Sequence, residues 1–304
     1  MMKNTINGWP GWPRRCLVWL VVATAALCAH AQEAPQPKPA PGAADLRATY
    51  QRLIRPLANN DFRRPLVIES SEGAGALAGD IHALMEYPFA TVKAAFGSAA
   101  NWCDVLILHV NTKYCHAGGA GLDVQMGQKT PEPLDRGAQL AFTFLVPPVA
   151  ADYFQVELTA PRGPLATHNY RIRLEAIALP GNQTFLHLSY AYESGLAGRL
   201  AMSAYLATGG RGKVGFSNTG LTHDGRPIYV GGLLALVERN TMRYYLALDA
   251  FLGALALPAA ERFEKRIDSW YSASEMYAQQ LHDMDRATYV DMKREEYRRQ
   301  QAAR

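Results

Sequence analysis

The chain has 304 residues, 49% of them hydrophobic, with 31 lysines and arginines against 27 acidic residues, a net charge of +4. Residues 1–31 hold three of the basic residues and none of the acidic ones, which leaves 28 against 27, a net charge of +1. This balance indicates no polyanionic partner for the remainder of the chain. Because no basic block is interleaved with aromatic residues, we do not expect a nucleic-acid partner either.

Residues 1–31 have the three parts of a cleavable secretory signal. Lys3, Arg14 and Arg15 give a positive start, residues 16–28 form an almost unbroken apolar run, and small residues then precede a cut after Ala31. The apolar run is shorter than the roughly 20 residues that a membrane-spanning helix needs. The sequence therefore predicts export by the general secretory route and a periplasmic or secreted location. An uncleaved membrane anchor is the alternative.

Cysteine usage agrees with export. Two of the four cysteines lie within the expected signal, which leaves Cys103 and Cys115. A pair of cysteines in an oxidising compartment predicts a disulfide, and closing a loop of about a dozen residues would stabilise the fold by roughly 3 kcal/mol. Two alternatives stay open, namely free thiols and a metal site completed by His109 and His116. The spacing of these four residues matches no common zinc pattern.

The first elements of the remaining chain differ in composition and periodicity. Residues 32–42 (QEAPQPKPAPG) are proline-rich and predict a linker. Apolar residues then recur every three and four positions over residues 43–58, which predicts an amphipathic helix. A strand is expected to begin at residues 66–68. A proline-initiated helix over residues 89–96 and a second short helix over residues 99–105 follow it.

Six strand-like stretches with turn residues between them come next. They cover residues 106–115, 121–127, 138–146, 153–160, 168–179 and 184–192. Their short connections favour an antiparallel meander, and glycines at 73, 75, 79, 118, 119 and 121 are expected to let the sheet curve. A helix over residues 196–207 and a glycine-rich link through Gly225 precede residues 231–257, which predict one long hydrophobic helix.

The C-terminal region is expected to be helical. Pro258 begins a helix over residues 259–281, whose apolar stripe predicts packing against the body. Beyond Leu281 the apolar stripe thins and the charges mix, so a solvated tail is expected, with a helix that meets a partner or a membrane surface as the alternative. On this interpretation, truncation after Leu281 leaves folding and ligand binding intact.

The short helices carry Tyr87-Pro88-Phe89 at their start and Asn101-Trp102-Cys103-Asp104 at their end. These residues, taken together with the order of strand, helix pair, six-stranded meander and long helix, resemble the START-like (helix-grip) superfamily. The resemblance covers about residues 64–257. The resemblance implies an α+β fold in which a curved antiparallel sheet grips a long C-terminal helix, with an N-terminal helix and additional C-terminal helices. The domain would span residues 43–257, and residues 258–304 would be a helical extension. The resemblance also implies a cavity for lipids, sterols or polycyclic molecules.

Candidate ligand-binding residues are side chains that would face such a cavity. They are Tyr87, Trp102, His109, Tyr170, Tyr190, Tyr192, Thr241 and Tyr245. Glu238, Arg239 and Arg243 are candidates for a polar anchor that recognises a ligand hydroxyl, carboxylate or phosphate, because charges amid apolar residues are costly unless paired or wet. The alternatives are ordinary core packing for the aromatic residues and a solvated helix face for the charges.

No nucleophile motif, phosphate-binding loop or zinc-protease motif occurs, so no catalytic residue, metal or cofactor is assigned. The sequence predicts an exported binder or carrier of a small hydrophobic ligand. One alternative is an enzyme on the same fold that acts on a lipid or polycyclic substrate. Another is an envelope interaction protein whose core is filled by its own side chains. The C-terminal helices are the candidate surface for a transient contact with a membrane or an envelope protein.

Overall fold

A computed structural model describes residues 42–302, apart from residues 74, 134–135, 150 and 208–211. The expected signal, residues 1–31, and all but the last residue of the expected linker lie outside the described residues. No helix within the described part of the chain is both long enough and apolar enough to cross a membrane.

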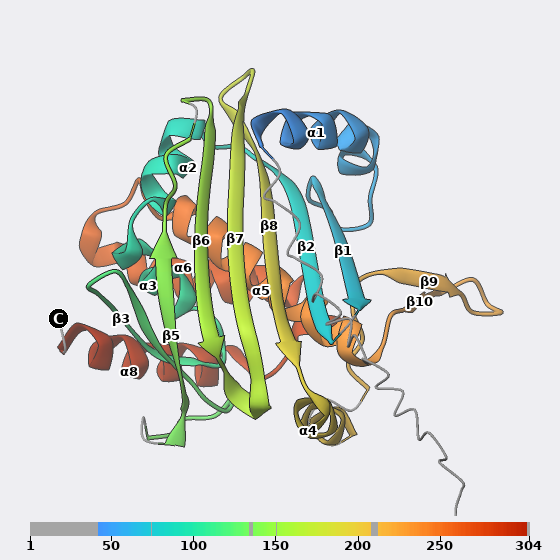
Figure 1. Ribbon diagram of the computed structural model, residues 1–304, viewed down its shortest axis with the longest axis vertical. Coiled ribbons are helices and arrows are strands. Elements are labelled where there is room, and N and C mark those ends of the chain that lie inside the picture. The colour runs from blue at the N-terminus through green and yellow to red at the C-terminus, as the bar shows by residue number, and fades with distance from the viewer. Residues whose placement is uncertain (1–41, 74, 134–135, 150, 208–211, 303–304) are drawn as a thin grey trace, which may run out of the picture. The chain divides into compact units, whose positions relative to one another are not determined.

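One eight-stranded antiparallel sheet forms the centre of the fold, in the order β1-β2-β8-β7-β6-β5-β4-β3 (Figure 1). Its strands are β1 Leu66–Gly73, β2 Ala76–Met85, β3 Thr112–Gly118, β4 Gly121–Met126, β5 Ala138–Leu145, β6 Tyr153–Arg162, β7 Thr167–Leu179 and β8 Gln183–Ser194. The sequence predicts a single strand before the helix pair, whereas the structure has a hairpin, β1–β2. Gly75 closes this hairpin at φ +88°, a conformation that side chains disfavour.

The helices lie mostly on one side of this sheet (Figure 1). They are α1 Ala43–Ala58, α2 Phe89–Phe96, α3 Ala99–Leu106, α4 Leu196–Ala207, α5 Gly232–Gly253, α6 Ala259–Glu275, α7 Ala278–Leu281 and α8 Arg286–Ala302. The long helix α5 packs against both β2 and α6, which explains why its buried residues surround most of its circumference. The α+β helix-grip arrangement predicted from the sequence is therefore confirmed.

Helix α1 covers part of the opposite face of the sheet (Figure 1). Its buried residues Leu46, Leu53 and Leu57 form a separate cluster with side chains of the sheet, among them Tyr153 and Phe185. The spacing of three and four that predicts this helix is therefore the spacing of its contacts with the sheet.

Two local predictions are wrong. The stretch over residues 106–115 is not one strand, because α3 ends at Leu106, residues 107–111 form a turn, and β3 begins only at Thr112. Residues 105–108 are all buried, so the run shows no periodicity that could separate helix from strand. The glycine-rich link before α5 also contains a small hairpin, β9 Asn218–Leu221 and β10 Pro227–Tyr229, which the sequence analysis does not predict.

Gly79 has a role other than the expected curvature of the sheet. A Cβ atom at this position would lie 2.4 Å from Oγ1 of Thr241 on α5, well inside van der Waals contact. The hydroxyl of Thr241 donates to the carbonyl of Val237 at 2.8 Å, which holds it in that place. Glycine therefore lets the closing helix approach β2 closely.

The expectation of a solvated tail beyond Leu281 is wrong. Helix α8 packs against α6 and β3, and it buries Tyr289, Met292, Lys293, Glu296 and Gln300. They are spaced by three or four positions, except for the adjacent Met292 and Lys293, and form one stripe along the helix. The stripe is hard to recognise in the sequence because three of its five members are polar or charged.

Candidate functional site

A pocket of about 990 Å³ lies between the sheet, α5 and the segment that follows β4. Its apolar wall includes Leu106, Val124, Leu140, Phe142, Met202 and Leu236. This volume and the mainly apolar wall are typical of sites that bind small molecules.

Four tyrosines supply an aromatic part of the wall. Tyr170 of β7 stacks on Tyr192 of β8 with ring centroids 5.2 Å apart, and Tyr190 of β8 lies 5.2 Å from Tyr244 of α5. Burial raises the pKa of the Tyr190 and Tyr244 hydroxyls well above 10, so both are neutral at physiological pH. The aromatic wall is therefore uncharged and suits an apolar or aromatic ligand.

His109 lies in the turn between α3 and β3 and lines the same pocket. Its Nδ1 accepts a hydrogen bond from the backbone N–H of Asn111 at 3.1 Å, which places the ring proton on Nε2. Burial and the nearby cations Arg243, Lys293 and Lys129 hold the pKa of His109 well below 6.5, so the ring is neutral. Nε2 is buried and has no hydrogen-bond partner among the described residues.

Cationic side chains line the pocket beside His109. Arg243 donates to Asp283 at 2.7 Å, and Lys129 donates to the other carboxylate oxygen of Asp283 at 2.6 Å. Arg243 and Lys129 hold the pKa of Asp283 at about 2, against the effect of its burial. Burial and Arg243 lower the pKa of Lys129 to about 8. We call Lys129 and Arg243, together with the neutral His109 beside them, the cationic corner of the pocket.

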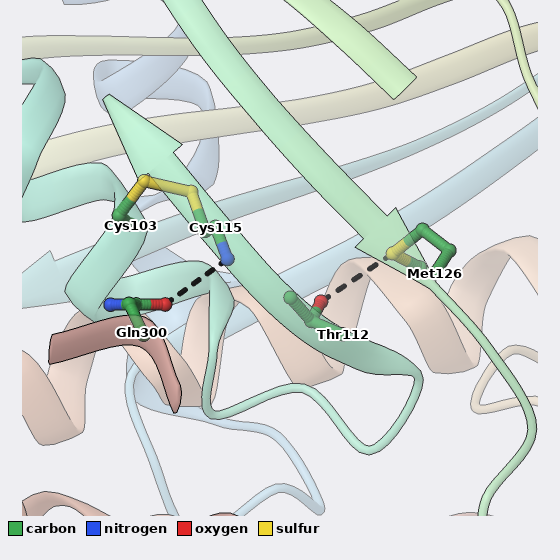
Figure 2. Close-up of a disulfide and its surroundings, with 5 residues drawn as sticks. All are labelled: Cys103, Thr112, Cys115, Met126 and Gln300. Carbon is green, nitrogen blue, oxygen red and sulfur yellow. Dashed lines mark hydrogen bonds between the residues drawn. A yellow bond between two sulfur atoms is a disulfide. The ribbon is translucent and has the colours of Figure 1, made fainter. Parts of the chain in front are cut away.

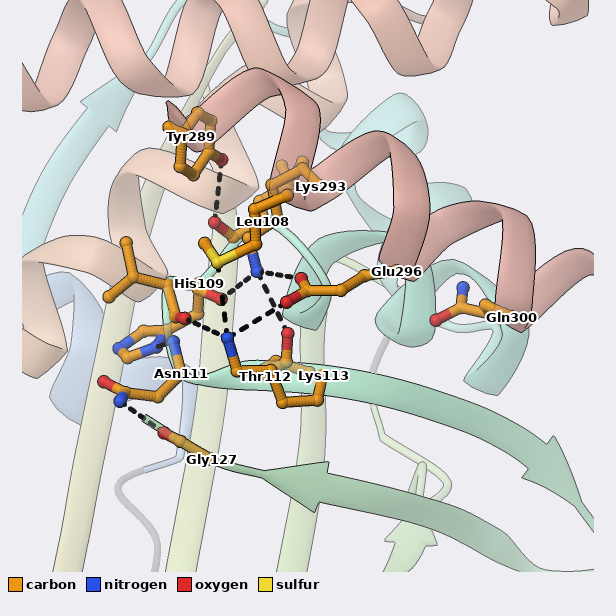
Figure 3. Close-up of polar contacts among 12 residues, drawn as sticks. Leu108, His109, Asn111, Thr112, Lys113, Gly127, Tyr289, Lys293, Glu296 and Gln300 are labelled. Atoms are coloured by element: carbon orange, nitrogen blue, oxygen red, sulfur yellow. Dashed lines mark hydrogen bonds and ion pairs between the residues drawn. The ribbon is translucent and has the colours of Figure 1, made fainter. Parts of the chain in front are cut away.

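Helix α8 holds the turn that carries His109 (Figure 3). Lys293 donates to the carbonyls of His109 at 2.7 Å and Thr112 at 3.0 Å, and the Tyr289 hydroxyl donates to the carbonyl of Leu108 at 2.8 Å. The carbonyl of His109 also accepts from the backbone N–H of Thr112 at 3.0 Å within the turn. The side chains of α8 add donors to this turn and to the start of β3, and thereby position His109.

A buried ion cluster strengthens this contact (Figure 3). The carboxylate of Glu296 accepts from Lys293 at 2.6 Å and from Lys113 at 3.0 Å, and all three side chains are almost fully buried. Lys113 also donates to the carbonyls of Val110 and Thr130. Because each ammonium group has several acceptors, the burial of two positive charges around one carboxylate is tolerated.

The predicted disulfide is present between Cys103 of α3 and Cys115 of β3, with Cα atoms 5.2 Å apart (Figure 2). Both thiols are used in this bond, so neither is a metal ligand in the structure. The backbone N–H of Cys115 donates to the side chain of Gln300 on α8 at 3.2 Å. The disulfide and α8 together therefore hold both sides of the His109 turn.

The structure brings six of the eleven candidate ligand-binding and anchor residues to the pocket. They are His109, Tyr170, Tyr190, Tyr192, Arg239 and Arg243. Four others lie in the packed core or its margin instead: Trp102 donates to the carbonyl of Phe96, Thr241 contacts Gly79, Tyr245 is buried, and Tyr87 lies beside Gly253.

Glu238 does not line the pocket. Its carboxylate accepts hydrogen bonds from the backbone N–H groups of Phe216 and Ser217 and from the hydroxyls of Ser217 and Ser70. These four bonds hold the link before α5 against α5 and β1. The alternative of a solvated helix face is wrong, because Glu238, Arg239 and Arg243 are all buried.

Three functional candidates were missed from the sequence. Tyr244 follows Arg243 on α5. The side of α5 that faces the pocket carries Leu236, Asn240 and Arg243, whereas the sequence analysis chose the side with Thr241 and Tyr245. Lys129 and Asp283 lie in irregular segments that are far apart in the chain and carry no local pattern. Their pairing depends on the docking of the C-terminal helices.

No protein-family model and no curated protein matches the sequence. Similar solved structures include a START superfamily protein from Mycobacterium smegmatis, with a TM-score of 0.30, 11% identity, and 43% of this chain and 78% of that chain covered. Human StAR-related lipid transfer protein 5 has a TM-score of 0.29 and 12% identity, with 50% of this chain and 83% of that chain covered. Truncated norcoclaurine synthase from Thalictrum flavum has a TM-score of 0.29 and 14% identity, with 46% of this chain and 90% of that chain covered.

Likenesses with TM-scores of 0.29 to 0.30 carry no conclusion about this chain, and its fold follows from its own elements. The described chain has a hairpin, two short helices, six further antiparallel strands and a long helix across the sheet. This order of elements is that of a helix-grip fold.

Proposed function

We propose that this protein is an exported binder or carrier of a small hydrophobic molecule, which it holds in the pocket between the sheet and α5. The observation that carries the proposal is the pocket of about 990 Å³ with its wall of aliphatic residues and neutral tyrosines. A grip filled by its own side chains would leave no such space, so the pocket favours a binder over a purely structural envelope protein.

Uptake of a neutral apolar fluorophore, N-phenyl-1-naphthylamine, tests the pocket. Leu236→Trp adds a large ring to the pocket wall, so we expect at least about a tenfold loss of affinity in fluorescence titrations. Leu233→Trp changes a partly buried residue of the same helix that does not line the pocket, and it should bind like the unaltered protein. Melting curves of both variants confirm that they are folded. Equal uptake by the two variants would contradict the assignment of the pocket.

Export is part of the proposal and is supported by the pattern of residues 1–31 and by the disulfide between Cys103 and Cys115. We expect the protein recovered from the periplasm of a Gram-negative expression host to begin at Gln32, which N-terminal sequencing determines. Recovery of the protein with residues 1–31 still attached would count against a cleavable signal.

A carrier must also exchange its ligand, and we propose a transient contact with a membrane or an envelope protein for this step. The apolar stripe of α8 faces the body of the protein, so a contact through the C-terminal helices would use their charged outer faces.

A further inference from the structure

The cationic corner carries more positive than negative charge. Arg243 and Lys129, which both line the pocket, lie 2.7 Å and 2.6 Å from the one carboxylate of Asp283, so two cations share a single negative charge. An apolar pocket with such a corner leaves positive charge uncompensated in a partly desolvated place.

Two buried hydrogen-bond donors in the same corner lack acceptors. They are Nε2 of His109 and Nε of Arg243, and neither has a partner among the described residues. Both side chains are at least 98% buried and both line the pocket. Buried donors in native proteins are normally satisfied, so unsatisfied ones at a pocket wall point to an acceptor that a ligand supplies.

Arg243 and Lys129 both lower the pKa of His109, which indicates that the three groups lie close together. The neutral ring of His109 stacks on Tyr244 with centroids 5.0 Å apart. The unsatisfied donors are therefore continuous with the aromatic wall, so one molecule can meet both parts of the pocket.

We infer that the ligand is an amphipathic acid, with an apolar body against the tyrosines and an oxyanion headgroup, carboxylate or phosphate monoester, in the cationic corner. The inference rests on the proposed function and names the chemical class of its ligand. A cationic amphiphile would be repelled by Arg243 and Lys129. A neutral alcohol could accept a hydrogen bond from His109 but would leave the excess positive charge uncompensated.

Calorimetric titration with dodecanoic acid, dodecyl phosphate and dodecan-1-ol tests the inference, since the three share one alkyl chain. We expect at least one of the two acids to bind about tenfold more tightly than the alcohol. The tighter of the two acids identifies the headgroup. Inorganic phosphate and acetate serve as headgroups without an apolar body, and we expect both to bind far more weakly.

Lys129→Gln and Lys213→Gln form a matched pair of variants. Both lysines pair with Asp283 and are about one-quarter exposed, but of the two only Lys129 lines the pocket. Lys129→Gln should lower the affinity for the preferred acid about tenfold and leave the affinity for the alcohol unchanged, whereas Lys213→Gln should change neither by more than about twofold.

The outcomes separate the two proposals. Tight binding of acid and alcohol with equal affinity would overturn the acidic headgroup and leave the hydrophobic pocket intact. If none of the three dodecyl compounds binds and the neutral fluorophore is not taken up either, the proposed function itself would be overturned. Equal losses in the two lysine variants, or inorganic phosphate binding as tightly as dodecyl phosphate, would also overturn the assignment of the cationic corner.

Discussion

Truncation after Leu281 is expected to unfold the protein, or to lower its free energy of unfolding by more than about 5 kcal/mol. The truncation removes Tyr289 and Met292 from the core, and losing one large buried side chain alone costs about 3–5 kcal/mol. It also leaves the buried ammonium group of Lys113 without Glu296, which costs a similar amount. Thermal melting and urea denaturation of the truncated and full chains measure the loss.

A surface variant of α8 provides the control for this experiment. Arg298 forms an exposed ion pair with Glu295, and Arg298→Ala should change the free energy of unfolding by no more than about 0.5 kcal/mol. The truncated chain is also expected to lose ligand binding, because Asp283 and the donors that position the His109 turn are absent. A truncated chain that melts with the full chain would show that the packing of α8 contributes little.

The free energy of unfolding is expected to fall by roughly 3 kcal/mol between pH 6.5 and pH 9 through His187 alone. His187 of β8 lies on the sheet face that α1 partly covers, with Nε2 2.8 Å from Asp80 and Nδ1 3.0 Å from Glu175. Hydrogen bonds and charge interactions with these carboxylates outweigh burial and raise the pKa of His187 to about 9. The ring is thus charged at neutral pH and bridges two acids.

The sign follows from the proton bound in each state. Below pH 6.5 His187 is protonated in both the folded and the unfolded chain, so its stabilisation is fully present. Between pH 6.5 and 9 only the folded chain keeps the proton, so stability is lost as the pH rises. His82 stacks on His187 at 4.3 Å, and burial and His187 lower its pKa to about 3, so it stays neutral across this range.

Comparison with His187→Gln isolates this effect by urea denaturation at pH 6.5, 7.5 and 9. The comparison is needed because Lys129 and Lys293 have their pKa lowered to about 8 by burial, so both favour the folded state as the pH rises above 8. The advantage of the unaltered protein over the variant should shrink by roughly 3 kcal/mol from pH 6.5 to 9. A constant difference across the range would contradict a charged His187.

Sequence reasoning found the fold and about half of the pocket for identifiable reasons. The strands are separated by proline and glycine turns, and α1 has one apolar face, so local patterns predict their presence. Successive side chains of a strand point to opposite faces of the sheet, so Tyr190 and Tyr192 of β8 share one face. Tyr170 of β7 lies on the same face. The same reasoning failed for the turn at His109, because the residues before it are uniformly apolar.

What the sequence by itself determined is therefore most of the main helices and strands and the antiparallel meander, because turn residues and periodicity are local signals. It also predicted the disulfide, because two cysteines remain outside the expected signal. Only the tertiary structure decided which side of α5 meets the pocket, since a helix buried around most of its circumference has no polar face to indicate its orientation. The tertiary structure also decided which charges are buried. Arg243 meets Asp283, and Lys113 meets Glu296 at a separation of 183 residues, and such pairs stabilise buried charge through contacts that no local pattern records.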